Sequence, residues 1–83
     1  MSTENVEIRP AQCRAARALL DLTQPELAKL AGLGLSTIVD FEKGRRQVSL
    51  PAIEAIQRAL RRAGVDFINE NGGGAGVRLC KRR

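Results

Sequence analysis

Prolines and glycines divide the first 64 residues of this 83-residue chain into four short segments. Each of the three prolines stands at the start of a pattern of apolar residues. A proline suits the first turn of a helix because the N–H group that it lacks has no partner within the helix there. Gly32, Gly44 and Gly64 each follow such a pattern, where a glycine can adopt the left-handed conformation that ends a helix. This punctuation predicts four short helices joined by tight turns.

Apolar residues repeat at three- and four-residue spacing within these segments, which is typical of helices with one buried face. Thr23 and Glu26 form a capping box that begins the second helix, and Ser49 is placed to cap the fourth. Because Phe41 and Phe67 are the only aromatic residues, the core must be built from Leu, Ile, Val and Ala. The predicted helices span residues 10–21, 24–31, 35–43 and 50–63.

The periodicity changes after Gly64. Residues 65–68 and 77–80 each have the composition of a short strand, and the glycine-rich stretch 72–76 lies between them. This pattern predicts a β-hairpin. An isolated hairpin is marginally stable in water, so we expect it to pack on the helices or to pair its edge with a second chain.

These elements predict a mainly α fold, in which a compact four-helix domain is followed by a C-terminal β-hairpin. The helical domain spans residues 10–64, and an N-terminal arm of residues 1–9 precedes it. The hairpin and a basic tail occupy residues 65–83, which we expect to serve in dimerisation.

The chain lacks residues that several classes of function require. The chain has no histidine, and Cys13 and Cys80 are too far apart in sequence to form a CxxC pair. A zinc site and a Cys/His nucleophile pair are therefore excluded, and we expect no enzyme activity, metal or cofactor. We interpret Cys13 as a small core residue. No apolar stretch reaches the roughly 20 residues of a membrane span and no secretory signal is apparent, so we expect a cytoplasmic protein without a membrane partner.

The net charge of +5 is distributed unevenly along the chain. Residues 1–42 carry four basic and six acidic side chains, whereas residues 43–83 carry ten basic and three acidic ones. The basic half begins at the sequence Lys43-Gly44-Arg45-Arg46. Such a cluster suits binding to phosphate, although a solvated basic surface has the same composition.

A set of residues is spaced as in two short helices that are joined by a tight turn. A small residue lies where the two helices cross closely, a glycine lies at the turn, and two apolar residues fill the angle between the helices. The residues of this pattern are Gln24, Ala28, Gly32, Ile38, Phe41, Glu42 and Gly44. The pattern resembles the Cro/lambda-repressor-like (XRE-type) helix-turn-helix family, over roughly residues 10–64.

The resemblance implies that the helix at residues 35–43 is a recognition helix that lies in the major groove of DNA. Leu35 and Val39 are then placed to pack on thymine methyl groups. Asp40 is placed either to accept a hydrogen bond from a cytosine amino group or to pair locally with Arg45. The residues implied to contact bases are Leu35, Ser36, Thr37, Val39 and Asp40.

Phosphate contacts and one ion pair also follow from the resemblance. Gln24 would bond a phosphate at the start of the second helix, where backbone N–H groups lack partners. Arg17 and Glu42 would form an ion pair that joins the first helix to the end of the recognition helix. The residues implied to contact phosphates are Gln24, Lys43, Arg45 and Arg46.

The sequence departs from the family at the recognition helix. Gly34 stands where Ser or Thr usually caps this helix, and Leu35 and Val39 replace residues that are commonly polar. The resemblance still implies a sequence-specific regulator, expected to be a repressor, that binds a near-palindromic operator in double-stranded DNA as a homodimer. The alternative is an antitoxin or accessory subunit of the same fold that also binds a partner protein, such as a toxin or a polymerase.

Overall fold

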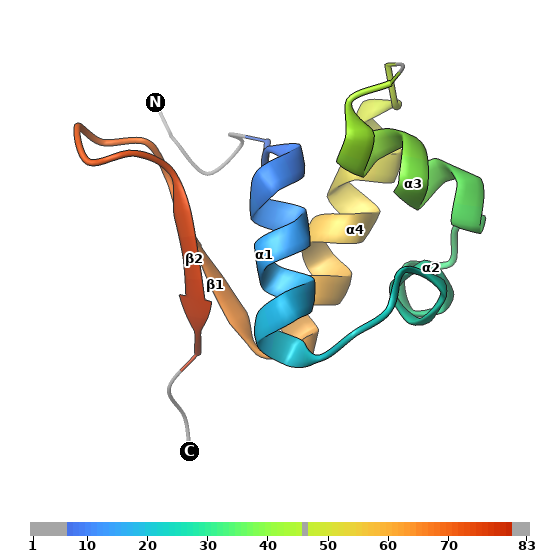
Figure 1. Ribbon diagram of the computed structural model, residues 1–83, viewed down its shortest axis with the longest axis horizontal. Helices are drawn as coiled ribbons and strands as arrows, with labels where there is room; N and C mark the ends of the chain where they lie inside the picture. Colours follow the sequence, from blue (N-terminus) through green and yellow to red (C-terminus); the bar gives the residue numbers. More distant parts are fainter. Residues whose placement is uncertain (1–6, 46, 81–83) are drawn as a thin grey trace.

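The computed structural model describes residues 7–45 and 47–80. Within these residues four helices are followed by one antiparallel β-hairpin (Figure 1). The predicted mainly α fold with a C-terminal hairpin is therefore confirmed. None of the helices in the described residues is both long and apolar enough to cross a membrane. The elements are α1 (Pro10–Leu20), α2 (Gln24–Ala31), α3 (Leu35–Lys43), α4 (Leu50–Ala63), β1 (Val65–Ile68) and β2 (Gly76–Leu79).

Three of the four helices begin and end as the local sequence predicts. The exception is α1, which ends at Leu20 and not at the predicted residue 21, because Asp21 adopts the left-handed conformation with a φ of 58° and is the C-cap. At the start of α2 the Glu26 N–H donates to the Thr23 hydroxyl at 3.1 Å, and the Thr23 N–H donates to the Glu26 carboxylate at 2.9 Å. The Ser49 hydroxyl accepts from the N–H of Ala52 at 3.3 Å and so caps α4. Gly32 ends α2 in the left-handed conformation, with a φ of 71°. These caps satisfy backbone groups that would otherwise lack partners at the helix ends.

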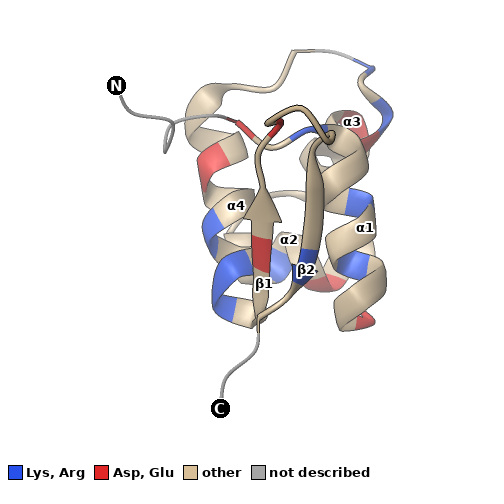
Figure 2. Cartoon of the chain, turned by 90° about the vertical axis from the view of Figure 1, so that its left-hand side faces the viewer, with Lys and Arg blue, Asp and Glu red and all other residues tan. Residues whose placement is uncertain are grey.

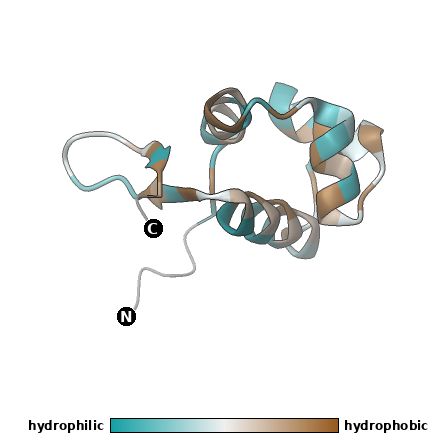
Figure 3. Cartoon of the chain, turned by 90° about the horizontal axis from the view of Figure 1, so that it is seen from below, coloured by the Kyte–Doolittle hydropathy of each residue, from teal (hydrophilic) through white to brown (hydrophobic). Residues whose placement is uncertain are grey.

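The four helices surround one apolar core (Figure 3). Ile38 of α3 and Ile56 and Leu60 of α4 are fully buried within it. Ile8, which precedes α1, and Val65, the first residue of β1, are also buried in this core. The core therefore includes residues on both sides of the four-helix segment.

The hairpin has one face toward the helices and one face toward solvent. Val65 pairs with Leu79 and Phe67 pairs with Val77, so these four side chains share one face. On the opposite face the Asp66 carboxylate and the Arg78 guanidinium lie 4.0 Å apart, and both side chains are exposed. Figure 2 shows an acidic position on β1 beside a basic position on β2. The second strand spans residues 76–79 and not the predicted 77–80. Its ladder continues for one more bond, because the Cys80 N–H donates to the Gly64 carbonyl at 2.7 Å.

The buried amide of Gln12 attaches the hairpin to α1. Its Nε2 atom donates to the carbonyl of Gly76 at 2.9 Å and to the carbonyl of Ile68 at 3.3 Å. Its Oε1 atom accepts from the N–H of Arg9 at 2.8 Å, immediately before the helix. The hairpin therefore packs on the helices, on the side of α1 that is remote from α3 (Figure 1).

Candidate nucleic-acid interface

Helix α3 has an inward face and an outward face. Ile38 and Phe41 are 0% and 6% exposed and hold the helix on the core. Its C-terminal end is fixed at Gly44, which has a φ of 62° and whose N–H donates to the carbonyl of Phe41. At the other end Gly34 is the N-cap and contributes no side-chain hydrogen bond, as its lack of a side chain requires. The face opposite Ile38 and Phe41 is thus presented outward on a helix held at its centre.

The five candidate base-contacting residues differ in exposure. Leu35 is 46% exposed and Ser36 is exposed, while Thr37, Val39 and Asp40 are half-buried. The Asp40 carboxylate lies 3.9 Å from the Arg45 guanidinium. Of the two roles considered for Asp40, the local ion pair with Arg45 is present in this structure.

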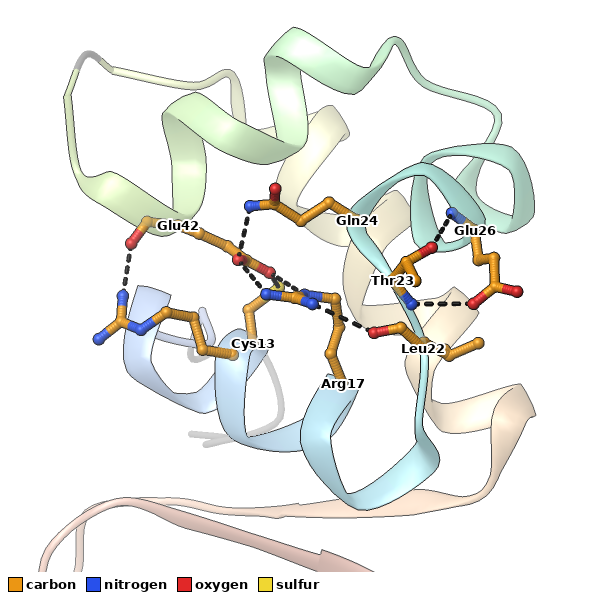
Figure 4. A network of polar contacts seen from close by, with 8 residues as sticks. Cys13, Arg17, Leu22, Thr23, Gln24, Glu26 and Glu42 are labelled. Atoms are coloured by element: carbon orange, nitrogen blue, oxygen red, sulfur yellow. Dashed lines mark hydrogen bonds and ion pairs between the residues drawn. The ribbon is translucent and has the colours of Figure 1, made fainter.

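The carboxylate of Glu42 joins three helices through hydrogen bonds (Figure 4). Arg17 of α1 donates to both of its oxygens at 2.7 Å. Gln24 of α2 donates to Oε1 at 3.0 Å, and the thiol of Cys13 donates to Oε2 at 3.1 Å. Arg17 also donates to the Leu22 carbonyl at 3.1 Å, so its guanidinium bridges α3 and the connection between α1 and α2. The ion pair that the family resemblance implies is one part of this larger network.

Burial and hydrogen bonding act in opposite directions on the Glu42 carboxyl. Burial raises its pKa, but the bonds from Arg17, Cys13 and Gln24 stabilise the ionised form, so the pKa lies below its ordinary value. The hydrogen bond to Glu42 raises the pKa of Arg17, with burial opposing. Burial and the bond to Glu42 raise the pKa of the Cys13 thiol. The network therefore consists of an ionised carboxylate, a guanidinium and a neutral thiol at neutral pH.

A groove of about 1010 Å³ opens between α1, the start of α2 and the end of α3. Of the residues proposed for phosphate contact, Gln24, Lys43 and Arg45 line this groove. Arg46 lies outside the described residues. The polar and charged residues from the helices and the loop after α3 that line the groove are Arg14, Arg17, Gln24, Glu42, Lys43 and Arg45.

Two residues of α1 that make long-range hydrogen bonds, Arg14 at the groove and Gln12 at the hairpin, were missed at the level of sequence. Arg14 donates through Nη1 to the backbone carbonyl of Glu42, which lies 28 residues further along the chain. It is three residues before Arg17, and this spacing places both side chains on neighbouring parts of one helix face, which is the signal that could have identified it. Gln12 is the third residue of α1, a position where Glu or Gln commonly bonds the residue before the helix.

Comparison with known proteins identifies relatives of this chain. The family described as Helix-turn-helix matches residues 14–67, which include α2, α3 and α4 in full. A protein of Methanothermobacter thermautotrophicus, named "Uncharacterized HTH-type transcriptional regulator", is 44% identical over 55 residues. This alignment covers 66% of the present chain and 80% of the relative.

Proposed function

Because this chain belongs to the XRE-type helix-turn-helix family of DNA-binding transcriptional regulators, we propose that it represses transcription as a homodimer bound to a near-palindromic operator. Helix α3 is the recognition helix of this proposal and enters the major groove. Two copies would place their recognition helices in half-sites about 34 Å apart, one turn of the double helix.

The observation that carries the proposal is the position of α3 beside the basic groove. Ile38 and Phe41 hold the inner face of α3 on the core, while Leu35 and Ser36 of the same helix are exposed to solvent. Backbone phosphates would bind along the groove that Lys43 lines, and base edges would meet the outer face of α3. One surface thus provides both affinity and sequence discrimination.

The proposal predicts binding that depends on both sequence and salt. The experiment selects bound duplexes from a random DNA pool and then titrates the selected duplex and a scrambled duplex at several salt concentrations. We expect tighter binding to the selected duplex and a steep fall in affinity as salt rises. Equal affinity for both duplexes at every salt concentration would contradict sequence-specific regulation.

Variants on α3 separate base contacts from the framework. Leu35→Ala and Ser36→Ala remove exposed side chains and are expected to change which bases are preferred while the fold is retained. Asp40→Ala tests a cytosine contact against the ion pair with Arg45. A contact to cytosine predicts a relaxed preference at one base pair, whereas a local ion pair predicts an unchanged preference.

The hairpin is the proposed dimer contact. Among the described residues the sheet consists of β1 and β2 alone. Each strand therefore has one edge that no other strand pairs with. Leu79 of β2 is 52% exposed at this end of the molecule. A symmetric contact through these hairpins would bury Leu79 and leave α3 accessible.

Sedimentation of two matched variants tests this contact. Leu79→Glu is expected to shift the chain from dimer to monomer, whereas Leu50→Glu, at a residue of similar exposure on α4, leaves the dimer intact. A monomeric wild-type chain that binds only one half-site would overturn the homodimer. That result would favour the alternative, an antitoxin or accessory subunit whose hairpin binds a toxin or a polymerase.

A further inference from the structure

Helix α1 contributes part of the wall of the basic groove, although it was not expected to contact DNA. Arg14 and Arg17 reach the groove from α1, and Lys43 and Arg45 reach it from the end of α3 and the following loop. Together they place four basic side chains around a groove that contains one carboxylate, that of Glu42. Such an excess of positive charge attracts an anion.

The two arginines of α1 have different surroundings. Arg17 is occupied by Glu42, to which it donates two hydrogen bonds at 2.7 Å, and its side chain is only 20% exposed. Arg14 is exposed, and its Nη1 atom donates a hydrogen bond to the Glu42 carbonyl. A guanidinium has five N–H donors in a planar fork, so this bond uses one of them, restrains the side chain and leaves the other donors for a ligand. No carboxylate forms an ion pair with Arg14 within the described residues.

The bond to the Glu42 carbonyl places Arg14 at the C-terminal end of α3. This carbonyl belongs to the last turn of the helix, where carbonyl groups have no partner within the helix and the helix dipole favours a cation. Lys43 directly follows Glu42 in the chain and also lines the groove. The Arg14 guanidinium is thereby held near Lys43 at the groove. Ordering a long side chain before binding reduces the entropy that is lost when it binds a ligand.

We propose that Arg14 binds a phosphodiester of the DNA backbone in this groove, so that α1 supplies a phosphate contact in addition to those of α2, α3 and the loop after α3. The inference rests on the proposed function, because it places the groove at the edge of the duplex that α3 enters. The competing role is a structural one, in which Arg14 only braces the end of α3.

Salt dependence distinguishes a phosphate contact from a brace. A contact to one phosphate displaces condensed counterions, and its loss reduces the magnitude of the negative slope of log K against log salt by about 0.9. Loss of a brace lowers affinity but leaves this slope unchanged. The experiment measures the affinity of the wild type, Arg14→Gln and Arg14→Lys for the selected duplex over roughly 50 to 200 mM salt. Arg58→Gln, an exposed arginine of α4 outside the groove, is the matched control.

We expect Arg14→Gln to reduce the magnitude of the slope by about 0.9, which corresponds to a loss of roughly eightfold in affinity at about 0.1 M salt. Arg14→Lys is expected to keep the slope because it keeps the charge, and Arg58→Gln is expected to behave as the wild type. An Arg14→Gln slope equal to that of the wild type overturns the phosphate contact and leaves the proposed function intact. Absence of DNA binding by the wild type at every salt concentration overturns both.

A second measurement covers the case in which Arg14→Gln does not fold. Duplexes with one neutral methylphosphonate linkage, placed at each position in turn, are titrated against the wild type and against Gln24→Ala, Lys43→Gln, Arg45→Gln and Arg46→Gln. We expect one linkage to weaken binding of all five proteins, because its partner is Arg14. If each sensitive linkage loses its effect in one of these four variants, the contact assigned to Arg14 is overturned.

Discussion

Arg17 and Glu42 form a bidentate ion pair between α1 and the last turn of α3, with Nε on Oε2 and Nη2 on Oε1, both at 2.7 Å. The Glu42 side chain is 2% exposed, whereas that of Arg17 is 20% exposed. Loss of Arg17 therefore leaves a buried carboxylate, whereas loss of Glu42 leaves a guanidinium that is partly accessible to water.

Removal of Arg17 is expected to destabilise the fold more than removal of Glu42. Arg17→Leu leaves a buried carboxylate without its cation, and we expect a loss of about 3 kcal/mol in the free energy of unfolding. Glu42→Leu leaves a guanidinium that can reach water, so its effect should be smaller. The double variant should lose less than the sum of the two single variants, measured by urea unfolding. Additive effects would contradict a coupled pair.

Stability is expected to fall in acid through Glu42. Because the pKa of its carboxyl in the folded chain lies below the ordinary value of 4.5, the ionised form stabilises the fold. This contribution is complete above about 4.5 and is lost as the pH falls through the lower pKa of the folded chain. Thermal unfolding between neutral pH and acid should show a weaker pH dependence for Glu42→Gln than for the wild type. Glu54→Gln, at an exposed residue of α4, is the control and should retain the wild-type profile.

The two free cysteines should differ in reactivity. Cys13 is 0% exposed and its thiol donates to Glu42, whereas Cys80 is exposed. Burial and the bond to Glu42 raise the pKa of the Cys13 thiol and so disfavour the reactive thiolate. Mass spectrometry after iodoacetamide treatment should find Cys80 alkylated in the native chain and Cys13 alkylated only in urea. Equal rates in the native chain would show that this part of the core opens readily.

Loss of the Gln12 amide should loosen the hairpin. Gln12→Ala removes the donor shared by the carbonyls of Ile68 and Gly76, at an expected loss of about 1 to 3 kcal/mol. Hydrogen exchange should accelerate in β1 and β2 more than in α2. Gln47→Ala changes an exposed glutamine outside the helices and strands and should leave exchange unchanged. Unaltered exchange in the strands of the Gln12 variant would mean that apolar packing alone holds the hairpin.

Two glycines that flank one turn should respond in opposite directions to substitution. A Cβ at Gly32 would meet no atom within 4 Å, but the φ of 71° disfavours every other residue, so Gly32→Ala should destabilise by about 1 kcal/mol. Gly34 has a φ of −73° at the N-cap of α3, and space for a Cβ is open there. Gly34→Ser should therefore stabilise by a few tenths of a kcal/mol, since its hydroxyl can accept from the first turn. Thermal unfolding checks both, and a stabilising Gly32→Ala would contradict the left-handed assignment.

Local interactions explain why the helices could be located from the sequence. The capping box at Thr23, the cap at Ser49 and the left-handed glycines act within three or four residues, so their geometry is encoded in short stretches. The bounds of α3, residues 35–43, follow from Gly34 and Gly44 on either side of an apolar repeat. The inward roles of Ile38 and Phe41 follow from the same repeat.

Long-range packing decided how the candidate site is assembled. Glu42 receives donors from Cys13, Arg17 and Gln24, which lie 18 to 29 residues earlier in the chain and converge only when α1, α2 and α3 pack together. Gln12 reaches carbonyls 56 and 64 residues away. Helical periodicity predicts which face of a helix a residue occupies. It does not predict which distant group that face contacts, because the contact depends on how whole helices cross. The sequence by itself therefore determined most helix ends and the inward face of α3, and the tertiary structure determined the Glu42 network, the attachment of the hairpin and the groove.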